Sequence, residues 1–272
     1  TYATFKVTGA VTDASGYTKV PVTHVVSSGS FSDDDGVGVH FEYSGADGTG
    51  DITSVVAGTG LSGGGTSGDV TLNSDLLGKQ EGTNFTDSLL VGHTTTGTLN
   101  AANYNTGVGA TALDAITSGD SNTAVGSASG TDLTTSGSNS FFGAGSGNNI
   151  ATGNGANTLL GYNSGFYNVS GRHNTAIGAY AAFGASGQSN DQNTAIGYYS
   201  LAAITTGDNN ITLGYQAGDN ITSGDGNVII GSIDADSATG DKQLIIADGV
   251  DGSVAWISGD SSANVVIGGT VT

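Results

Sequence analysis

The stretch NTAIGYYSLAAITTGDNNITLGYQAGDNITSGDGNVIIG, residues 193–231, contains one pattern three times. NTAIG is followed seventeen residues later by NITLG, and NVIIG follows after seventeen more. Each unit opens on Asn, carries an apolar residue at its fourth position and has Gly at its fifth. A fixed period of this length is the signature of a repeat architecture, in which each unit packs on its neighbours.

The same unit extends back to residue 105, with spacings of 17, 17, 18, 17, 19, 17 and 17 residues. The opening asparagines are Asn105, Asn122, Asn139, Asn157, Asn174, Asn193, Asn210 and Asn227. The fifth-position glycines are Gly109, Gly126, Gly143, Gly161, Gly178, Gly197, Gly214 and Gly231. The fourth position holds Val108, Val125, Phe142, Leu160, Ile177, Ile196, Leu213 and Ile230. The eighth position is always small, and it holds Ala112, Ser129, Ser146, Ser164, Ala181, Ser200 and Ala217.

This period predicts an all-β chain that forms a parallel β-roll or β-solenoid of about 17-residue coils, stacked about 4.8 Å apart. Each coil is expected to hold two short strands, the second in patches such as ITSGD, residues 116–120. The fourth-position residue is expected to fill the interior, and the following Gly to turn the chain where φ is positive. The small eighth position predicts close packing between layers or between chains.

The column of opening asparagines has two interpretations. Stacked amides can hydrogen-bond up the ladder or cap the corner of each coil. The alternative is a column that binds a ligand. The architectural interpretation is preferred because the residue opens every unit.

A thin interior favours assembly. Each coil buries two or three apolar side chains worth about 1.5–3 kcal/mol apiece, against about 1–2 kcal/mol of backbone ordering for every residue of the coil. Partner chains are therefore expected. Segments that flank the roll are expected to cover its ends.

Four regions are predicted along the chain. Residues 1–50 alternate apolar and polar residues and form a small N-terminal antiparallel β-domain, and residues 51–87 form a Gly-rich connector. The β-roll spans residues 88–231, beginning with the degenerate unit SLLVG. Residues 232–272 form a C-terminal β segment, with degenerate coils expected at QLIIA, residues 243–247, and NVVIG, residues 264–268, and a cap.

Composition excludes several functions. Five Lys and Arg against 24 Asp and Glu give a net charge of −19, which disfavours nucleic acid and anionic membranes as partners. No apolar run approaches the roughly 20 residues of a membrane helix, so membrane insertion is not expected. There is no Cys, hence no disulfide or thiolate site, and no Met even at position 1, so the natural chain is expected to begin upstream.

Motifs of catalysis and cofactor binding are weak, so the chain is expected to be no enzyme and to hold no cofactor or metal. GTGLSG, residues 58–63, matches a dinucleotide fingerprint, but the residues after it cannot form the required helix. The cluster Asp234, Asp236 and Asp241, like the run DDD at residues 33–35, lacks the closing Glu of a calcium loop. Glu42 and Glu81 offer no obvious pair for glycoside cleavage, and the four histidines are far apart.

The units NTAIGYYSLAAITTGDN and NITLGYQAGDNITSGDG resemble the head repeats of trimeric autotransporter adhesins and related repeats of bacteriophage tail fibres. GDITSVVAGTGLSGGGTSGDVTLN, residues 50–73, and LIIADGVDGSVAWISGDSSANVVIGG, residues 244–269, also resemble tail-fibre segments. The resemblance covers about residues 50–272. It implies a trimeric parallel β-roll, usually left-handed, although this unit is longer than the typical adhesin repeat.

The expected function is therefore a non-enzymatic homotrimeric phage fibre, acting as rod or host-attachment appendage in the virion. Other virion or tail proteins and a host cell-surface glycan or protein are the partners implied. The alternatives are a bacterial surface adhesin head and an ice- or glycan-binding solenoid. Ice binding is suggested by the second-position column Thr106, Thr123, Ser140, Thr158, Thr175 and Thr194, which then changes to Ile211 and Val228. No residue is assigned to a receptor, although Tyr162, Tyr198, Tyr199 and Tyr215 suit either sugar stacking or packing.

Overall fold

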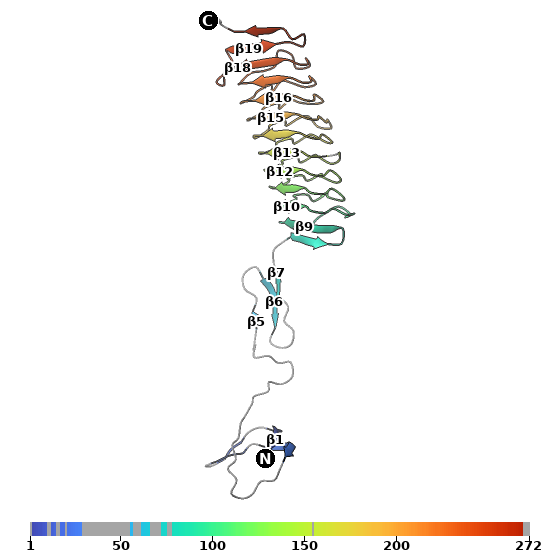
Figure 1. Ribbon diagram of the computed structural model, residues 1–272, viewed down its shortest axis with the longest axis vertical. Helices are drawn as coiled ribbons and strands as arrows, with labels where there is room; N and C mark the ends of the chain where they lie inside the picture. Colours follow the sequence, from blue (N-terminus) through green and yellow to red (C-terminus); the bar gives the residue numbers. More distant parts are fainter. Residues whose placement is uncertain are drawn as a thin grey trace. The chain divides into compact units, whose positions relative to one another are not determined.

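The computed structural model describes residues 2–9, 12–14, 17–19, 21–28, 55–56, 61–65, 72–74, 78–153 and 155–268 (Figure 1). These residues form strands, turns and bends, and none of them is helical. The chain divides into two compact units. One comprises Thr1–Val56 and Gly64–Thr71, and the other comprises Ala57–Gly63 and Leu72–Thr272.

The first unit is built from antiparallel pairs, as its alternating sequence predicts. Its strands are β1 (Tyr2–Val7), β2 (Thr12–Ala14), β3 (Tyr17–Lys19), β4 (Val22–Ser28) and β5 (Val55–Val56). β1 pairs with β4, and β2 pairs with β3. β5 pairs with the last two residues of β6 (Leu61–Gly65). Residues 29–50 of the predicted N-terminal domain lie outside the described residues.

The second unit is a parallel β-solenoid, which confirms the predicted fold class. Nine successive parallel pairings join β9 (Phe85–Val91) to β18 (Leu244–Ala247). The strands between them are β10 (Thr106–Val108), β11 (Thr123–Val125), β12 (Ser140–Phe142), β13 (Thr158–Leu160), β14 (Thr175–Ile177), β15 (Thr194–Ile196), β16 (Ile211–Leu213) and β17 (Val228–Ile230). Each strand is one rung of the ladder in Figure 1.

The orientation of each rung differs from the prediction. In each of β10 to β17 the middle residue, at the third position of the unit, is buried, and the residues on either side face outward. In β12, Phe141 is fully buried and Phe142 is 44 % exposed. The expectation that the fourth position fills the interior was therefore wrong. Side chains alternate along a strand, so a three-residue rung that buries its middle residue directs both flanking residues outward.

The interior is filled by complementary pairs. Where the third position is Gly107, the ninth is the buried Leu113. Where the third position is Phe141, the ninth is Gly147, and a Cβ on Gly147 would lie 2.8 Å from the tip of the Phe141 ring. Where both positions are small, as at Ala124 and Gly130, side chains of the adjacent coils fill the space, because a Cβ on Gly130 would lie 3.1 Å from both Leu113 and Phe141. Further along five of the coils lies a fully buried Ile or Leu, namely Ile116, Leu133, Ile150, Ile204 and Ile221.

The expected second strand of each coil is absent from the described coils. Patches such as residues 116–120 are turns and bends, although hydrogen bonds still join the coils there. Thr117 N donates to Thr134 O at 3.0 Å, and Thr134 N donates to Ala151 O at 2.9 Å. Backbone with positive φ bends each coil, as at Thr111 (57°) and Leu113 (59°). One strand and a chain of tight turns therefore complete each coil.

Antiparallel strands cover both ends of the ladder. β8 (Gly78–Gly82) pairs with β9, β19 (Ala255–Gly259) pairs with β18, and β20 (Val265–Ile267) pairs with β19. In the same unit, β7 (Leu72–Ser74) pairs with residues 61–63. Residues 243–247 thus form a coil of the ladder as predicted, whereas residues 264–268 are antiparallel and not a further coil.

Candidate functional site

The opening asparagines form a continuous buried column. Each is between 0 and 3 % exposed. The Oδ1 of Asn105 accepts from both the backbone N–H and the Nδ2 of Asn122, at 3.0 Å each, and the same backbone bond recurs at every coil. The Nδ2 also donates to the corner of its own coil, as from Asn105 to Gly119 O at 2.8 Å. The column starts at Ser88 Oγ and ends at Gln243. Its amides are used within the chain, which leaves the ligand-column alternative without support.

The fifth-position glycines turn the chain between rung and corner. Their φ values lie between 116° and 141°, a range that residues with a side chain rarely adopt. They also stack directly on one another, because a Cβ on Gly109 would lie 2.5 Å from the carbonyl oxygen of Gly126. Gly is therefore required at this position for two reasons, the positive φ of the backbone and the close contact between successive coils.

The small eighth-position column lies wholly inside the solenoid. All seven of its members are fully buried within a single chain. Ser146 Oγ donates to Leu159 O at 3.1 Å, and Ser200 Oγ lies 2.6 Å from Thr212 Oγ1. This column therefore packs between successive coils of one chain, which is the first of the two predicted contacts, and none of its side chains is exposed for a contact between chains. The side chains are small because the neighbouring rung fills the space beside them.

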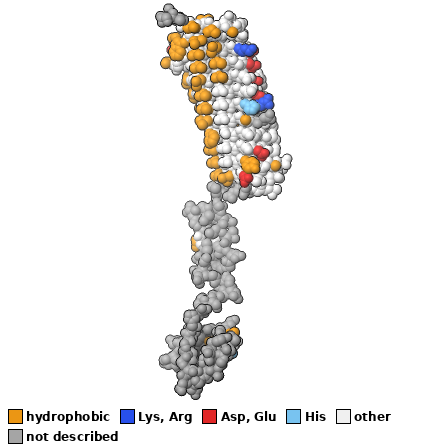
Figure 2. Space-filling model, in the orientation of Figure 1, with side chains coloured by type: hydrophobic (Ala, Val, Ile, Leu, Met, Phe, Trp, Pro, Cys, Tyr) orange, Lys and Arg blue, Asp and Glu red, His pale blue; other side chains and the backbone are white. Residues whose placement is uncertain are grey.

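An outward apolar column takes the place that was predicted for a buried one. The fourth-position residues of β10 to β17 are all partly or largely exposed, among them Val108 at 37 %, Leu160 at 50 % and Leu213 at 45 %. They form the apolar stripe that Figure 2 shows along the solenoid. The signal for this surface was present in the sequence, because the fourth position is apolar in every unit while the buried third position varies from Gly to Phe.

The second-position residues run beside this column on the same face. They are Thr or Ser from β10 to β15, and become Ile211 and Val228 in β16 and β17. With Leu244 and Ile246 of β18 at the same two positions, both outward columns are apolar in the last three coils, and the stripe of Figure 2 widens toward the C-terminal end of the solenoid. The outward face of the ladder is therefore amphipathic for most of its length and wholly apolar near residue 230.

Tyrosines extend this surface around the glycine corner. Tyr162, Tyr198 and Tyr215 are 52, 45 and 53 % exposed. The rings of Tyr198 and Tyr215 stack with centroids 5.6 Å apart and an interplanar angle of 11°. Tyr180 contacts Tyr162 edge to face at 5.3 Å, and local desolvation and its tyrosine neighbours raise the pKa of Tyr180. The rings pack on one another and leave one edge of the row open to solvent.

Several carboxyl groups of the solenoid have shifted pKa values with different physical causes. Burial and the facing carboxyl of Asp234 raise the pKa of Asp219 to about 6. Four backbone N–H groups, led by Val254, lower the pKa of Asp248 to about 2 and hold the loop between β18 and β19. Burial also raises the pKa of Asp114, although His93 opposes the shift. These groups stabilise or strain individual corners and do not converge on one point.

The weak motifs are not assembled into a site. Asp234 faces Asp219, whereas Asp241 accepts the Asp225 backbone N–H at 2.9 Å. Within the described residues no group of three or more His, Asp or Glu side chains is placed to hold a metal ion. Residues 33–35, Glu42 and the first half of GTGLSG lie outside the described part. The part of the chain that is described also contains no helix of the length and hydropathy needed to cross a membrane.

Comparison with known proteins adds no relative. No family model, curated protein or solved structure matches the chain.

Proposed function

We propose that the chain is a structural, non-enzymatic subunit of a homotrimeric bacteriophage fibre, acting as rod or host-attachment appendage. One observation carries the proposal: eight successive rungs place an apolar side chain on the same outward column, where the described residues leave it partly or largely exposed. Large exposed apolar patches of this kind mark protein interaction surfaces. The partner proposed for this column is the same column in two further copies of the chain, because those copies have the same length and the same period.

The resemblance of the repeats to tail fibres and adhesin heads supplies the class of assembly. A solenoid with antiparallel strands at both ends suits a rod, because the described ends of the parallel ladder are covered while one long face remains open. The residues placed at the centre of the trimer are the fourth-position column, and the tyrosine row lies at its margin.

Light scattering on residues 1–272, with circular dichroism on the same sample, tests the assembly. The expected result is the mass of three chains with a β spectrum. The variant Leu160→Asp with Ile177→Asp should have the mass of one chain and keep the spectrum, because both side chains point outward. The matched control Thr135→Asp adds a charge at an exposed turn and should leave the mass unchanged. A folded wild-type monomer would overturn the proposal.

A bacterial adhesin head would give the same masses. Immunogold labelling separates the two, since a fibre subunit is labelled on phage particles and an adhesin head on the bacterial surface.

A second candidate, ice binding, is favoured by the row of Thr or Ser on β10 to β15 beside an aliphatic column on one face. Such a face would have to remain uncovered, so this function requires a monomer. If a freezing droplet of the protein shows thermal hysteresis and light scattering gives the mass of one chain, ice binding replaces the fibre proposal.

A further inference from the structure

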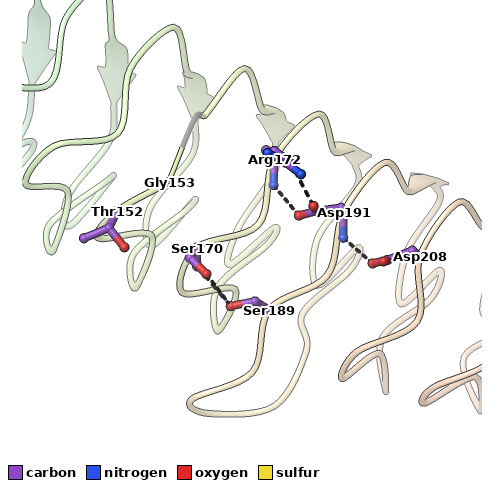
Figure 3. A pocket seen from close by; sticks show the side chains of 7 residues that line it. All are labelled: Thr152, Gly153, Ser170, Arg172, Ser189, Asp191 and Asp208. Atoms are coloured by element: carbon purple, nitrogen blue, oxygen red, sulfur yellow. Dashed lines mark hydrogen bonds and ion pairs between the residues drawn. The ribbon is translucent and has the colours of Figure 1, made fainter.

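The repeat departs from its period at two places that flank one coil. The units that begin at Asn139 and Asn174 have 18 and 19 residues, whereas the unit at Asn157 between them has 17. A groove of about 340 Å³ opens at this point (Figure 3). Thr152, Ser170, Ser189, Arg172, Asp191 and Asp208, from four successive coils, line it. Insertions in repeat proteins commonly form the binding face.

Arg172 stands in a column that holds no other cation. The position two residues before the opening Asn, or before Gln243, is Asp120, Asp191, Asp208, Asp225 and Asp241 in five coils and Asn103, Gly137 and Gly155 in three others, and Arg172 is the only arginine of the chain. Its backbone N–H and its Nε each donate to a different oxygen of Asp191 at 3.0 Å. The Asp191 N–H in turn donates to Asp208 at 2.7 Å. The Arg172 side chain is 47 % exposed and makes no further ion pair with the described residues, so its terminal N–H groups are available.

Two buried amides support this arrangement from behind. Asn168 occupies the place that Ile150 and Ile204 hold in neighbouring coils, and it is only 4 % exposed. It accepts from Gly171 N–H at 2.8 Å and donates to Asn190 O at 3.1 Å. The backbone on either side of Arg172 and Asp191 is thereby fixed by polar contacts in a place where the other coils have an apolar side chain. A fully satisfied polar network of this kind makes a site rigid.

The chemistry of the groove fits hydroxyl groups. Arg172 donates and Asp191 and Asp208 accept, while the Ser170 and Ser189 hydroxyls lie 2.8 Å apart at the rim. Two carboxylates against one guanidinium, in a chain of net charge −19, disfavour an anionic ligand. A vicinal diol can accept from a guanidinium and donate to a carboxylate at the same time.

We propose that this groove binds a neutral sugar unit of a glycan, with Arg172 and Asp191 hydrogen-bonding adjacent hydroxyls and Ser170 and Ser189 bonding the next. The proposal deepens the host-attachment role of the fibre and rests on it. It places recognition at the irregular coils of the rod and leaves the apolar column free for assembly.

A printed array of neutral oligosaccharides beside uronate- and sialate-containing ones, probed with labelled chain 1–272, tests the groove. Binding to neutral glycans is expected. Arg172→Ala and Arg172→Lys should each weaken it by about tenfold or more, since lysine keeps the charge and loses the planar fork. Asp120→Asn changes the same column three coils before Arg172, where Asp120 accepts the Asn103 N–H, and should bind like wild type.

The experiments distinguish an error in the sugar-site proposal from an error in the fibre proposal. A trimer by light scattering that binds no neutral glycan, or only acidic ones, overturns the sugar site alone. Unchanged binding in both Arg172 variants, with an unchanged spectrum, likewise overturns it. A monomer whose neutral-glycan binding depends on Arg172 keeps the sugar site and overturns the fibre.

Discussion

Phe141 and Phe142 are neighbours in β12, but they belong to two different surfaces. Phe141 is fully buried against the glycines of its own and the preceding coil, and Phe142 is 44 % exposed on the outward column. The same contrast recurs at every rung. Inside, the residue type changes from coil to coil because a neighbour in the same coil or in an adjacent coil compensates its volume. Outside, the residue stays apolar although the described residues leave it partly or largely exposed.

The difference separates two causes of periodicity. The asparagine and glycine columns repeat because each coil cannot close without them. The outward apolar column repeats without such a need, since a polar side chain there would be better solvated in an isolated chain. A periodic feature that the fold does not require points to a periodic partner, and another copy of the solenoid provides one.

The largest expected effect comes from making the same substitution, Phe to Ala, at two neighbouring positions, of which one is buried and the other faces outward. Phe141→Ala should lower the free energy of unfolding by about 3–5 kcal/mol, because it leaves a cavity between glycines that cannot fill it. Phe142→Ala should cost much less in a dilute sample of dissociated chains. Urea unfolding followed by circular dichroism measures both.

Protein concentration supplies the control for this pair. If Phe142 is covered by another copy, the cost of Phe142→Ala should grow with chain concentration, whereas that of Phe141→Ala should stay the same. Equal costs at all concentrations would show that the outward column has no partner.

A smaller loss is expected from the polar interior. Asn174 Oδ1 accepts the Asn193 N–H at 2.9 Å, and its Nδ2 donates to Asn157 and Asn190. Asn174→Ala leaves these buried groups without partners and should cost about 2–4 kcal/mol. Thr175→Ala, the next residue and an outward one, should cost far less under the same urea titration. A similar cost for both would mean that the amide column is not what joins the coils.

Much of this fold could be predicted from the spacing of Asn and Gly alone. A seventeen-residue period leaves few architectures, and the amide column follows from stacking one Asn on the next. The direction of the fourth position could not be predicted in this way. The fourth position is apolar in every unit, and this constant character suggested burial. The position that is buried is the third, which is free to vary from Gly107 to Phe141 because Leu113 and Gly147 compensate for the volume of its side chain.

The groove at Arg172 was only partly visible in the sequence. The 18- and 19-residue spacings mark the place, and a lone arginine among aspartates marks the residue. The bond between Arg172 and Asp191 depends on coils stacking in register after an insertion, and a sequence pattern does not fix where inserted residues bulge.

The smallest effect concerns Asp219, a half-buried group that belongs neither to the satisfied interior nor to the apolar face. Burial and Asp234 raise its pKa to about 6 from an ordinary value of 3.8. The folded chain therefore takes up a proton at a pH where the unfolded chain does not. Its contribution to stability is present below about pH 4 and is lost as the pH rises through about 6.

Asp219→Asn should consequently flatten the dependence of the urea midpoint on pH between about pH 4 and pH 7, and should raise the midpoint at neutral pH relative to wild type. Asp234→Asn removes the facing carboxyl and should flatten the same dependence. Flattening in both variants would indicate that the interaction between the two carboxyls, and not the net charge of the chain, sets the slope. Identical slopes in wild type and both variants would show that the two carboxyls do not interact. Because the causes of the Asp219 shift, burial and Asp234, lie within one chain, the slope should not depend on chain concentration, in contrast to the effect of Phe142→Ala.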